Sequence, residues 1–289
     1  MKINYVLITA ARNEETYIEK TIKAVLSQGL LPKQWVIVSD ASEDRTDEIV
    51  KEVASKKEFI YFIRKEKKPG EIGFASKVNA LQLGYGNLAK VPYDFIGHLD
   101  ADVSFGAEYY QCIIEKALNK PSLGITGGFI YERTGTGFRS RPSNTGESVA
   151  GAIQFFRRKC YEDIGQFIPI PVGGEDWYAE IVARMKGWEV KSYPELKVFH
   201  HKKGVRTRGL IKENFRQGMV DFCFGTHPLF EIAKVARRVK EKPYFFAALV
   251  RLAGFLWSYP SRLERVVPRE IIEYLRREQL ARLRAKLCL

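Results

Sequence analysis

The chain has 289 residues, of which 45% are hydrophobic, and this is enough to bury one large core or one core with an appendage. Its four cysteines are scattered without CxxC spacing, which indicates neither a zinc knuckle nor a disulfide framework and fits a reducing compartment. The net charge of +13 is concentrated late in the chain, because residues 231–289 hold fourteen Lys and Arg against six Asp and Glu. Such a basic excess fits a protein that binds nucleic acid, anionic lipid or a phosphorylated ligand. It also fits a basic surface that contacts only solvent.

The first hundred residues alternate between strand-like and helix-like hydrophobic periods. The apolar run that begins the chain has no small-residue cleavage site, so it predicts a first strand rather than a signal peptide. Strands are predicted at 5–9, 35–39, 59–64 and 95–99, and helices at 14–27, 44–54 and 75–83. The alternation predicts an α/β domain, Rossmann-like, with a mostly parallel sheet flanked by helices.

Polar residues follow three of these strands directly, at 10–14, 40–46 and 100–102. Ligands of such sheets bind beyond the carboxyl ends of the strands, so these three segments are expected to converge on one crevice.

The second half of the chain has a different pattern. An apolar, Gly-rich stretch at 123–131 precedes a flexible polar segment at 134–147. A Gly-Gly-Glu-Asp-Trp cluster at 173–177 leads into a helical stretch at 177–185. Strand-like residues at 188–190 and 198–199 follow, and they end at two adjacent histidines.

From about residue 229 the composition indicates a C-terminal helical extension rich in Arg, Leu and aromatic residues. Its segment 244–259 is nearly all apolar and carries only Arg251 as a charge. Sixteen residues are short for a spanning helix, which needs roughly 20. The segment fits either an interfacial or re-entrant helix flanked by basic helices, or a helix packed on the main domain.

The Asp-Ala-Asp sequence at 100–102 places two carboxylates in one loop after a buried strand. Hard oxygen ligands of this kind suit Mg²⁺ or Mn²⁺ that is also held by a diphosphate. The tripeptide alone is common and is usually no more than a polar turn, but its place beside the two other polar strand ends favours the metal.

Together these motifs resemble the GT-A glycosyltransferases of family 2, over roughly residues 3–205. The resemblance rests on the segments 9–15, 38–42 with Asp44 and Thr46, 77–81, 99–102 and 174–176. It implies a GT-A fold, a nucleotide-sugar donor, a divalent cation and inversion of the anomeric centre without a covalent intermediate.

The resemblance also implies a donor site. Ala11, Arg12, Glu14 and Asp40 would hold the nucleoside, with Asp40 accepting a hydrogen bond from a base N–H. Asp40 also fits a turn or an N-cap, and Asp44 with Thr46 fits capping better than catalysis.

The same resemblance places Lys77 near the donor phosphates, although a solvated lysine fits the sequence equally well. Asp102 would bind the metal, and Asp100 would bind the ribose or a metal-bound water.

On the acceptor side, the resemblance makes Asp176 the general base that deprotonates the acceptor hydroxyl, with Glu175 beside it in the acceptor site. Both acidic residues also suit the positive end of the helix that follows. His200 and His201 lie where some GT-A enzymes supply a further metal ligand. Because side chains alternate along a strand, only one should face the crevice, and His200 is favoured. A basic loop at 202–208 follows, which fits a cover for the diphosphate or a solvated surface.

The predicted activity is therefore the transfer of one sugar from a UDP- or GDP-sugar to an acceptor hydroxyl or a lipid-linked phosphate. The Gln-x-x-Arg-Trp segment of processive synthases is only loosely matched at 215–218, which favours single-sugar transfer. A sugar-nucleotide nucleotidyltransferase is an alternative, but residues 10–13 are not its Gly-rich basic loop. A nucleic-acid-binding protein is the second alternative, and no signature of one is present.

The predicted domains are a GT-A catalytic domain at 1–228 and a helical extension at 229–289. Residues 1–105 form the nucleotide-binding half of the catalytic domain and residues 106–228 the acceptor-binding half. We expect a cytoplasmic protein, with residues 231–289 making a peripheral contact at the inner face of the cell membrane and a saccharide or polyprenyl-linked acceptor.

Overall fold

The structure is a computed structural model that describes residues 3–66, 73–88, 91–135, 137–165, 167–202, 209–238 and 245–287. It consists of two compact units, the first comprising residues 1–171 and 175–203 and the second residues 172–174 and 204–289. The helix at 210–223 therefore groups with the C-terminal helices and not with the sheet. The functional division at 105 and 228 stays a prediction.

The first unit is built on one sheet, which the described residues form in the order β3-β2-β1-β4-β8-β6-β9-β5, with β7 paired to β6. The strands are β1 (Tyr5–Ala11), β2 (Gln34–Asp40), β3 (Ile60–Lys65), β4 (Phe95–His98), β5 (Val103–Phe105), β6 (Leu123–Thr134), β7 (Gly137–Ser140), β8 (Phe155–Arg157) and β9 (Glu189–His200).

Strands β1 to β4 are mutually parallel, and their carboxyl ends meet at one edge of the sheet. Every residue of β2 and β4 is buried, as expected for strands covered on both faces. Trp35 donates its indole N–H to the Thr9 hydroxyl at 3.0 Å, so even the largest side chain of this core has its polar atom satisfied.

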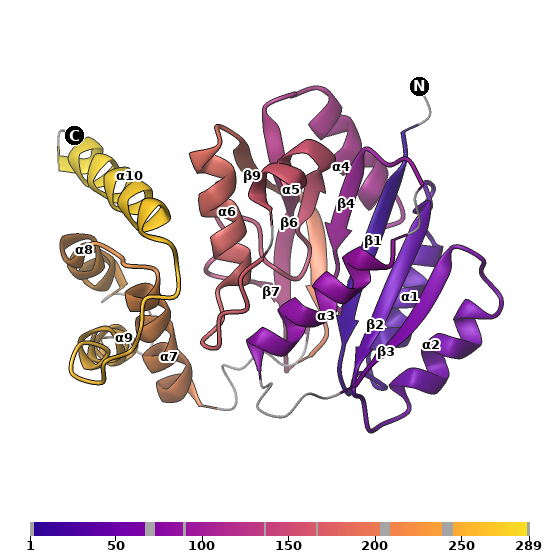
Figure 1. The fold of residues 1–289 in the computed structure, drawn as a ribbon, viewed down its shortest axis with the longest axis horizontal. Coiled ribbons are helices and arrows are strands. Elements are labelled where there is room, and N and C mark those ends of the chain that lie inside the picture. The colour runs from indigo at the N-terminus through magenta and orange to yellow at the C-terminus, as the bar shows by residue number, and fades with distance from the viewer. Residues whose placement is uncertain are drawn as a thin grey trace. The chain divides into compact units, whose positions relative to one another are not determined.

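Helices cover both faces of the sheet, with α3 across one face and α1 on the other (Figure 1). The helices of the first unit are α1 (Ile18–Leu26), α2 (Thr46–Ala54), α3 (Phe74–Gly86), α4 (Tyr109–Leu118), α5 (Arg158–Ile164) and α6 (Glu175–Met185). The α/β class with a mostly parallel sheet, which the sequence predicts, is confirmed.

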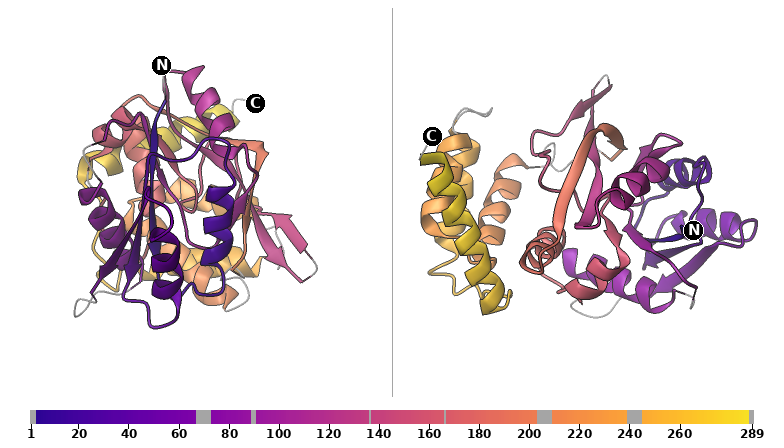
Figure 2. Two further views of the ribbon diagram at one scale, coloured as in Figure 1. Left: turned by 90° about the vertical axis from the view of Figure 1, so that its right-hand side faces the viewer. Right: turned by 90° about the horizontal axis from the view of Figure 1, so that it is seen from above.

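Several predicted elements differ from the structure. The helix expected from residue 14 begins at Ile18, because the chain first turns at Asn13, whose φ is 53°. The segment expected to be a flexible loop contains β7, which forms a hairpin with β6 that projects from the sheet (Figure 2). The two strand-like stretches after residue 187 are one strand, β9, whose pairing with β6 is interrupted at Phe129.

The second unit is helical, with α7 (Leu210–Cys223), α8 (Pro228–Arg238), α9 (Phe246–Trp257) and α10 (Arg269–Leu287). Helices α7 and α9 cross closely where Gly218 and Gly254 face the partner backbone, since a Cβ at either would lie about 2 Å from a carbonyl oxygen of the other helix. Arg251, the one charge of the apolar segment, is buried and bonds to Asp221 at 2.6 and 2.7 Å. Tyr244, the first residue of that predicted segment, lies outside the described residues.

No helix in the described part of the chain is both long and apolar enough to cross a membrane. The three described cysteines are free thiols.

Candidate active site

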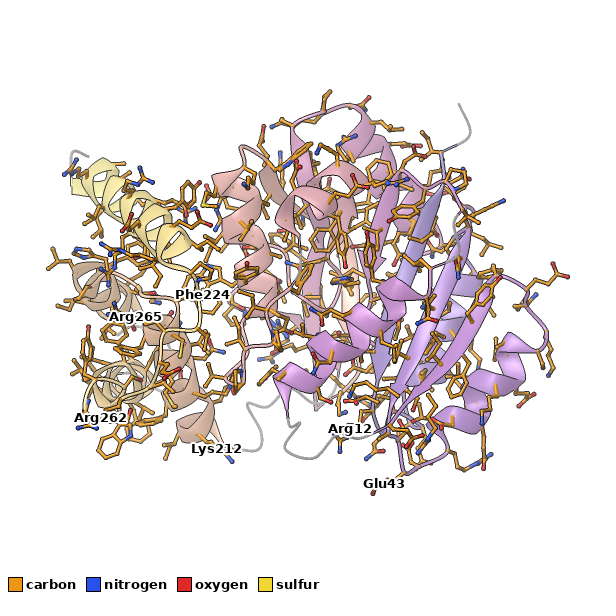
Figure 3. All side chains as sticks on the ribbon, viewed as in Figure 1. Arg12, Glu43, Lys212, Phe224, Arg262 and Arg265 are labelled. Atoms are coloured by element: carbon orange, nitrogen blue, oxygen red, sulfur yellow. The ribbon has the colours of Figure 1, made fainter. Side chains whose placement is uncertain are left out.

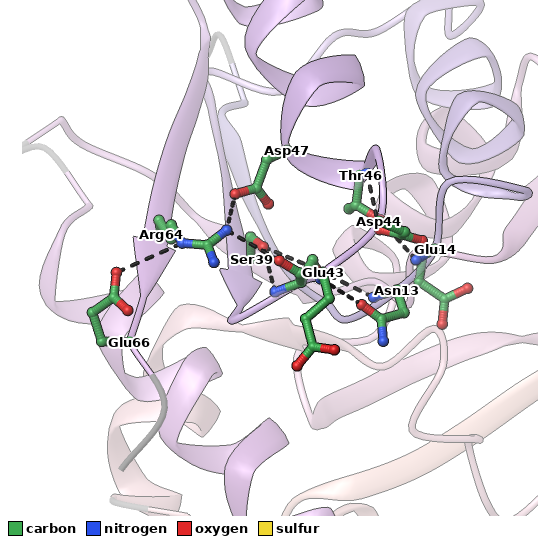
Figure 4. Close-up of polar contacts among 10 residues, drawn as sticks. Asn13, Glu14, Ser39, Glu43, Asp44, Thr46, Asp47, Arg64 and Glu66 are labelled. Atoms are coloured by element: carbon green, nitrogen blue, oxygen red, sulfur yellow. Dashed lines mark hydrogen bonds and ion pairs between the residues drawn. The ribbon is translucent and has the colours of Figure 1, made fainter.

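The loops that follow β1 and β2 are tied together by hydrogen bonds (Figure 4). Asn13 accepts from the amide of Glu43 at 2.9 Å, and the amide of Glu14 donates to the Thr46 hydroxyl at 2.8 Å. Asp44 accepts from the amide of Thr46 at 3.0 Å, at the start of α2, so it stabilises the helix start as the sequence predicts. The backbone at Asn13 and at Ala41 has positive φ, which is uncommon for residues other than Gly and concentrates at binding sites.

Asp40 ends β2 in a buried polar cluster. It is the register partner of Lys65, the last residue of β3, and Lys65 Nζ lies 2.8 Å from one carboxylate oxygen. The other oxygen accepts from the Ser76 hydroxyl at 2.5 Å and lies 3.9 Å from Arg12. Arg12 is over one-third exposed and lies at the carboxyl end of β1 with Glu43 nearby (Figure 3), while Ala11 is buried. The carboxylate is thus fixed at the strand end where a nucleoside base is expected.

Lys77 bridges the two sides of the site. Its ammonium lies 2.8 Å from Asp100, which follows β4, and 3.6 Å from Glu175, the first residue of α6. Burial alone would lower the pKa of Lys77, but the charges of Asp100 and Glu175 outweigh it and raise that pKa above its ordinary value. Burial raises the pKa of Glu175, and Lys77 opposes the rise. Lys77 therefore stays charged and brings together carboxylates that are 75 positions apart in the sequence.

Asp102 and His200 are direct neighbours. The antiparallel pairing of β5 with β9 brings His200 Nε2 to 2.9 Å from an Asp102 oxygen, while His201 points away and bonds to the Ser104 hydroxyl at 2.8 Å. Burial would raise the pKa of Asp102 and lower that of His200, but their hydrogen bond and charges shift both pKa values the opposite way. His200, and not His201, is thus the histidine that lies beside Asp102.

Glu14 approaches the same carboxylates from the loop after β1. Burial raises the pKa of Glu14 to about 7, and the ion pair with Lys202 only partly offsets this. Asp102 and Asp100 raise it further through their negative charge. The rest of the predicted basic loop, residues 203–208, lies outside the described residues.

A divalent cation fits part of this site. The described residues contain no group of three or more His, Cys, Asp or Glu side chains arranged around a metal position. Asp102 and His200 nevertheless offer one oxygen and one nitrogen ligand side by side, a set that suits Mn²⁺ with the remaining ligands from a diphosphate. One oxygen of Glu14 is buried without a hydrogen-bond partner among the described residues. Asp100 is held by Lys77 instead, because the ammonium neutralises it directly.

Asp176 lies in the first turn of α6, next to Glu175, so the helix starts two residues earlier than predicted. One of its oxygens accepts from the amide of Gly151 at 3.0 Å and the other from its own neighbour Trp177 at 2.8 Å. The carboxylate has a fixed orientation and retains free lone pairs, which is what a positioned base requires.

Two groups of the site have no counterpart in the sequence motifs. Lys65 could have been found, because it ends a parallel strand in register with Asp40. Glu180 lies four residues after Asp176 on α6, so the helical period places it beside Asp176. The segment 148–154 has no such signal, since only the folded chain brings it beside these two residues.

A family model described as Glycosyl transferase family 2 matches residues 6–175. Poly-beta-1,6-N-acetyl-D-glucosamine synthase of Staphylococcus aureus (strain COL) is 32% identical over 123 residues, which are 42% of this chain and 27% of the synthase. The chain thus spans about a quarter of the length of this curated relative.

Two solved structures share the fold. The mannosyltransferase PcManGT from Pyrobaculum calidifontis, in complex with GDP-Man and Mn²⁺, has a TM-score of 0.57 at 16% identity over 98% of this chain and 81% of its own. S. aureus TarS 1-349 in complex with UDP-GlcNAc has a TM-score of 0.54 at 13% identity over 94% of this chain and 78% of its own. These likenesses confirm the predicted GT-A fold, and the family match confirms the resemblance to the family 2 glycosyltransferases.

Proposed function

Because this chain belongs to glycosyl transferase family 2, we propose that it transfers one sugar from a nucleotide-diphosphate sugar to an acceptor, with inversion at the anomeric carbon and with help from a divalent metal. The acceptor group is a hydroxyl or a lipid-linked phosphate. The observation that carries the proposal is the bridge made by Lys77 between Asp100 and Glu175, since it joins the donor side and the acceptor side in one site.

Donor binding is assigned to the strand ends of the first unit. Arg12, Glu14 and the backbone at Ala11 would surround the nucleoside, and Asp40 would accept a hydrogen bond from the base. The relatives solved with GDP-Man and with UDP-GlcNAc support a guanosine or uridine donor, and the contacts of Asp40 with Lys65 and Ser76 favour neither base.

The metal would be held by Asp102 and His200, with Asp100 close enough to bind a metal-bound water or the ribose. The Mn²⁺ in the mannosyltransferase complex supports this choice of cation, and Mg²⁺ suits the same carboxylates. When bound, the cation neutralises the charge of the leaving nucleoside diphosphate. Lys77 adds a second positive charge to that side, and its contact with Asp100 keeps it there.

Asp176 would act as the general base and Glu175 would line the acceptor site. The acceptor oxygen forms a bond to the anomeric carbon while the bond from that carbon to the diphosphate oxygen breaks. The proton of an acceptor hydroxyl passes to Asp176, and the bonding electrons leave with the nucleoside diphosphate. A single displacement of this kind inverts the anomeric centre, and a positioned base contributes about 10²- to 10⁴-fold in rate.

The test is a screen of UDP- and GDP-sugars with Mn²⁺ and saccharide acceptors, with the anomeric configuration of donor and product read by NMR. Inverted product is expected, and Asp176→Asn should lower kcat by about 10²- to 10⁴-fold. Asp94→Asn is the control, because Asp94 precedes β4 at the opposite edge of the sheet and bonds the amide of Asn4. Retained configuration, or full turnover by the Asp176 variant, would overturn the proposed chemistry.

We also propose that residues 231–289 place the enzyme at an anionic membrane surface, where the acceptor is a polyprenyl-linked sugar or phosphate. One face of α9 supports this, because Leu249, Leu256 and Trp257 are 58%, 55% and 60% exposed and Phe246 is 48% exposed. Their spacing puts them on one stripe of the helix, opposite the face that packs on α7.

The charges around this stripe favour anionic lipid over an apolar protein partner. Arg262 and Arg265 follow α9 directly and are exposed (Figure 3), within the stretch of chain that holds most of the positive excess. Aromatic side chains beside basic ones suit the headgroup layer of a membrane at the inner face of the cell.

Flotation with vesicles tests the membrane contact. The full chain should float with phosphatidylcholine–phosphatidylglycerol vesicles, float less with phosphatidylcholine alone, and be released by Trp257→Glu. Tyr61→Glu is the matched control, since Tyr61 is an aromatic residue 47% exposed on β3. A wild-type chain that stays unbound to the anionic vesicles would overturn the proposal.

A further inference from the structure

The segment 148–154, which leads into β8, contacts both halves of the site although it contains none of the predicted site residues. One end faces Glu180, its middle faces Asp176, and its last residues face the end of β4 and Asp100. A single stretch of seven residues therefore touches the proposed base and the proposed donor-side carboxylate.

The contact with Asp176 is close. The amide of Gly151 donates to an Asp176 oxygen at 3.0 Å, and a Cβ at Gly151 would lie 2.9 Å from the Asp176 Cβ. Gln154, which is 1% exposed, donates its side-chain amide to the Asp176 carbonyl oxygen at 3.1 Å. Position 151 thus admits glycine and little else without moving the carboxylate.

The contact with the donor side is made by the backbone. The carbonyl of Ala152 accepts from the amide of Asp100 at 2.9 Å, and the carbonyl of Gln154 accepts from the amide of His98 at 2.8 Å. Because these carbonyls lie one and three residues after Gly151, Asp176 and Asp100 are linked by hydrogen bonds through a short stretch of chain.

Glu180 holds the beginning of the segment. One carboxyl oxygen accepts from the Val149 amide at 2.6 Å and from the Ser148 hydroxyl at 2.9 Å, and Arg184 lies 3.5 Å from the other. The residue is 2% exposed. Burying a carboxyl group costs free energy unless its oxygens accept hydrogen bonds. Here those hydrogen bonds also fix the position of the segment, which apolar packing alone would leave less defined.

We propose that Glu180 and the segment 148–154 are positioning groups that hold Asp176 at a fixed distance from Asp100 during sugar transfer. The inference rests on the proposed function, because it assigns these groups to the same reaction. The role assigned to them is to act through Asp176.

Gly151→Ala tests the positioning directly. The added methyl must displace Asp176, so kcat should fall at least tenfold while the KM for the nucleotide sugar stays unchanged, since misplacement of about 1 Å can cost roughly 10²-fold. Gly146→Ala is the control, because nothing lies within 4 Å of a Cβ there. Equal kcat in the two variants would overturn the inference.

Glu180 is tested by rescue and by amide hydrogen exchange. Glu180→Leu should lower kcat and speed the exchange of the Val149, Gly151 and Asp100 amides at least tenfold. Glu180→Gln keeps an acceptor oxygen and should restore both.

The exchange measurement separates the two hypotheses. A wild-type chain without transfer to any acceptor would overturn the proposed function, and the exchange rates would still decide whether Glu180 holds the segment. If the amide exchange rates of Gly151 and Asp100 are unchanged in a folded Glu180→Leu variant, Glu180 does not stabilise the contacts of the segment with the site. That result would contradict the inference.

Discussion

At the residue scale, the charged groups of the site are held by one another and by backbone amides. Lys77 neutralises Asp100, His200 faces Asp102, and two amides orient Asp176. Each carboxylate thus has a defined direction before any ligand binds, and preorganised charge of this kind is the main source of electrostatic catalysis.

Glu180 makes stability depend on pH. Burial raises the pKa of Glu180 from 4.5 to about 7, so the folded chain holds this proton more tightly than the unfolded chain. The stabilisation that the protonated Glu180 gives to the folded chain is fully present below pH 4.5, and it is lost as the pH rises through 7 and the carboxyl ionises. The difference in unfolding free energy between wild type and Glu180→Gln should therefore fall by up to about 3 kcal/mol between pH 4.5 and 8.

Urea unfolding of both proteins across that pH range measures this difference. Glu195→Gln is the control, because Glu195 is half-exposed and its pKa is lowered by Lys116. A difference between wild type and Glu180→Gln that is flat with pH would mean that Glu180 is ionised at no cost in the folded chain.

At the scale of elements, the crossing of α7 and α9 explains the apolar segment that the sequence leaves ambiguous. One face of α9 packs on α7 through Gly218 and Gly254, and its only charge, Arg251, is neutralised by Asp221 inside the unit. The opposite face remains exposed. The segment is thus a packed helix, and the membrane contact proposed for it concerns the exposed face alone.

Gly218→Ala should destabilise the second unit. The new Cβ would lie 2.0 Å from the carbonyl oxygen of Arg251 and 2.6 Å from the amide nitrogen of Phe255, and both are backbone atoms that cannot rotate away. The helices must separate, at a cost of about 1–3 kcal/mol or more.

Denaturation monitored by circular dichroism measures this loss of stability. Gly86→Ala, at the end of α3 where no atom lies within 4 Å of a Cβ, should be neutral or slightly stabilising. If Gly218→Ala unfolds at the wild-type midpoint, the close crossing of α7 and α9 is wrong.

At the scale of the whole molecule, a nucleotide that binds only the folded chain must raise its stability. UDP or GDP at about 100 times its Kd should add about 2.7 kcal/mol. Because the metal is assigned to Asp102 and His200, the gain should require Mn²⁺ or Mg²⁺, and Asp102→Asn should lose most of it.

A thermal-shift series with UDP, GDP and their sugars, with and without EDTA, measures this gain and identifies the base. Asp94→Asn should respond as the wild type does. If the nucleotide raises the stability equally in the presence of EDTA, it binds without a metal, and this result would contradict the proposed metal site.

The sequence by itself determined the fold class and the ends of the first four strands to within two residues, because the hydrophobic period of a buried parallel strand and the polar residues after it are local signals. It also indicated that one of two adjacent histidines faces inward, since alternation along a strand is a local property. The start of the helix after β1 was predicted too early, because the turn at Asn13 depends on bonds to the loop after β2.

Only the tertiary structure decided which charges meet. Nothing near Lys77 in the sequence indicates Asp100 or Glu175, and nothing near Glu180 indicates Ser148 and Val149. The helix at 210–223 joined the C-terminal unit for the same reason, because its partner α9 lies beyond α8 in the chain. Pairings between distant residues depend on the register of strands and the packing of helices, and these are properties of the folded chain and not of any local segment.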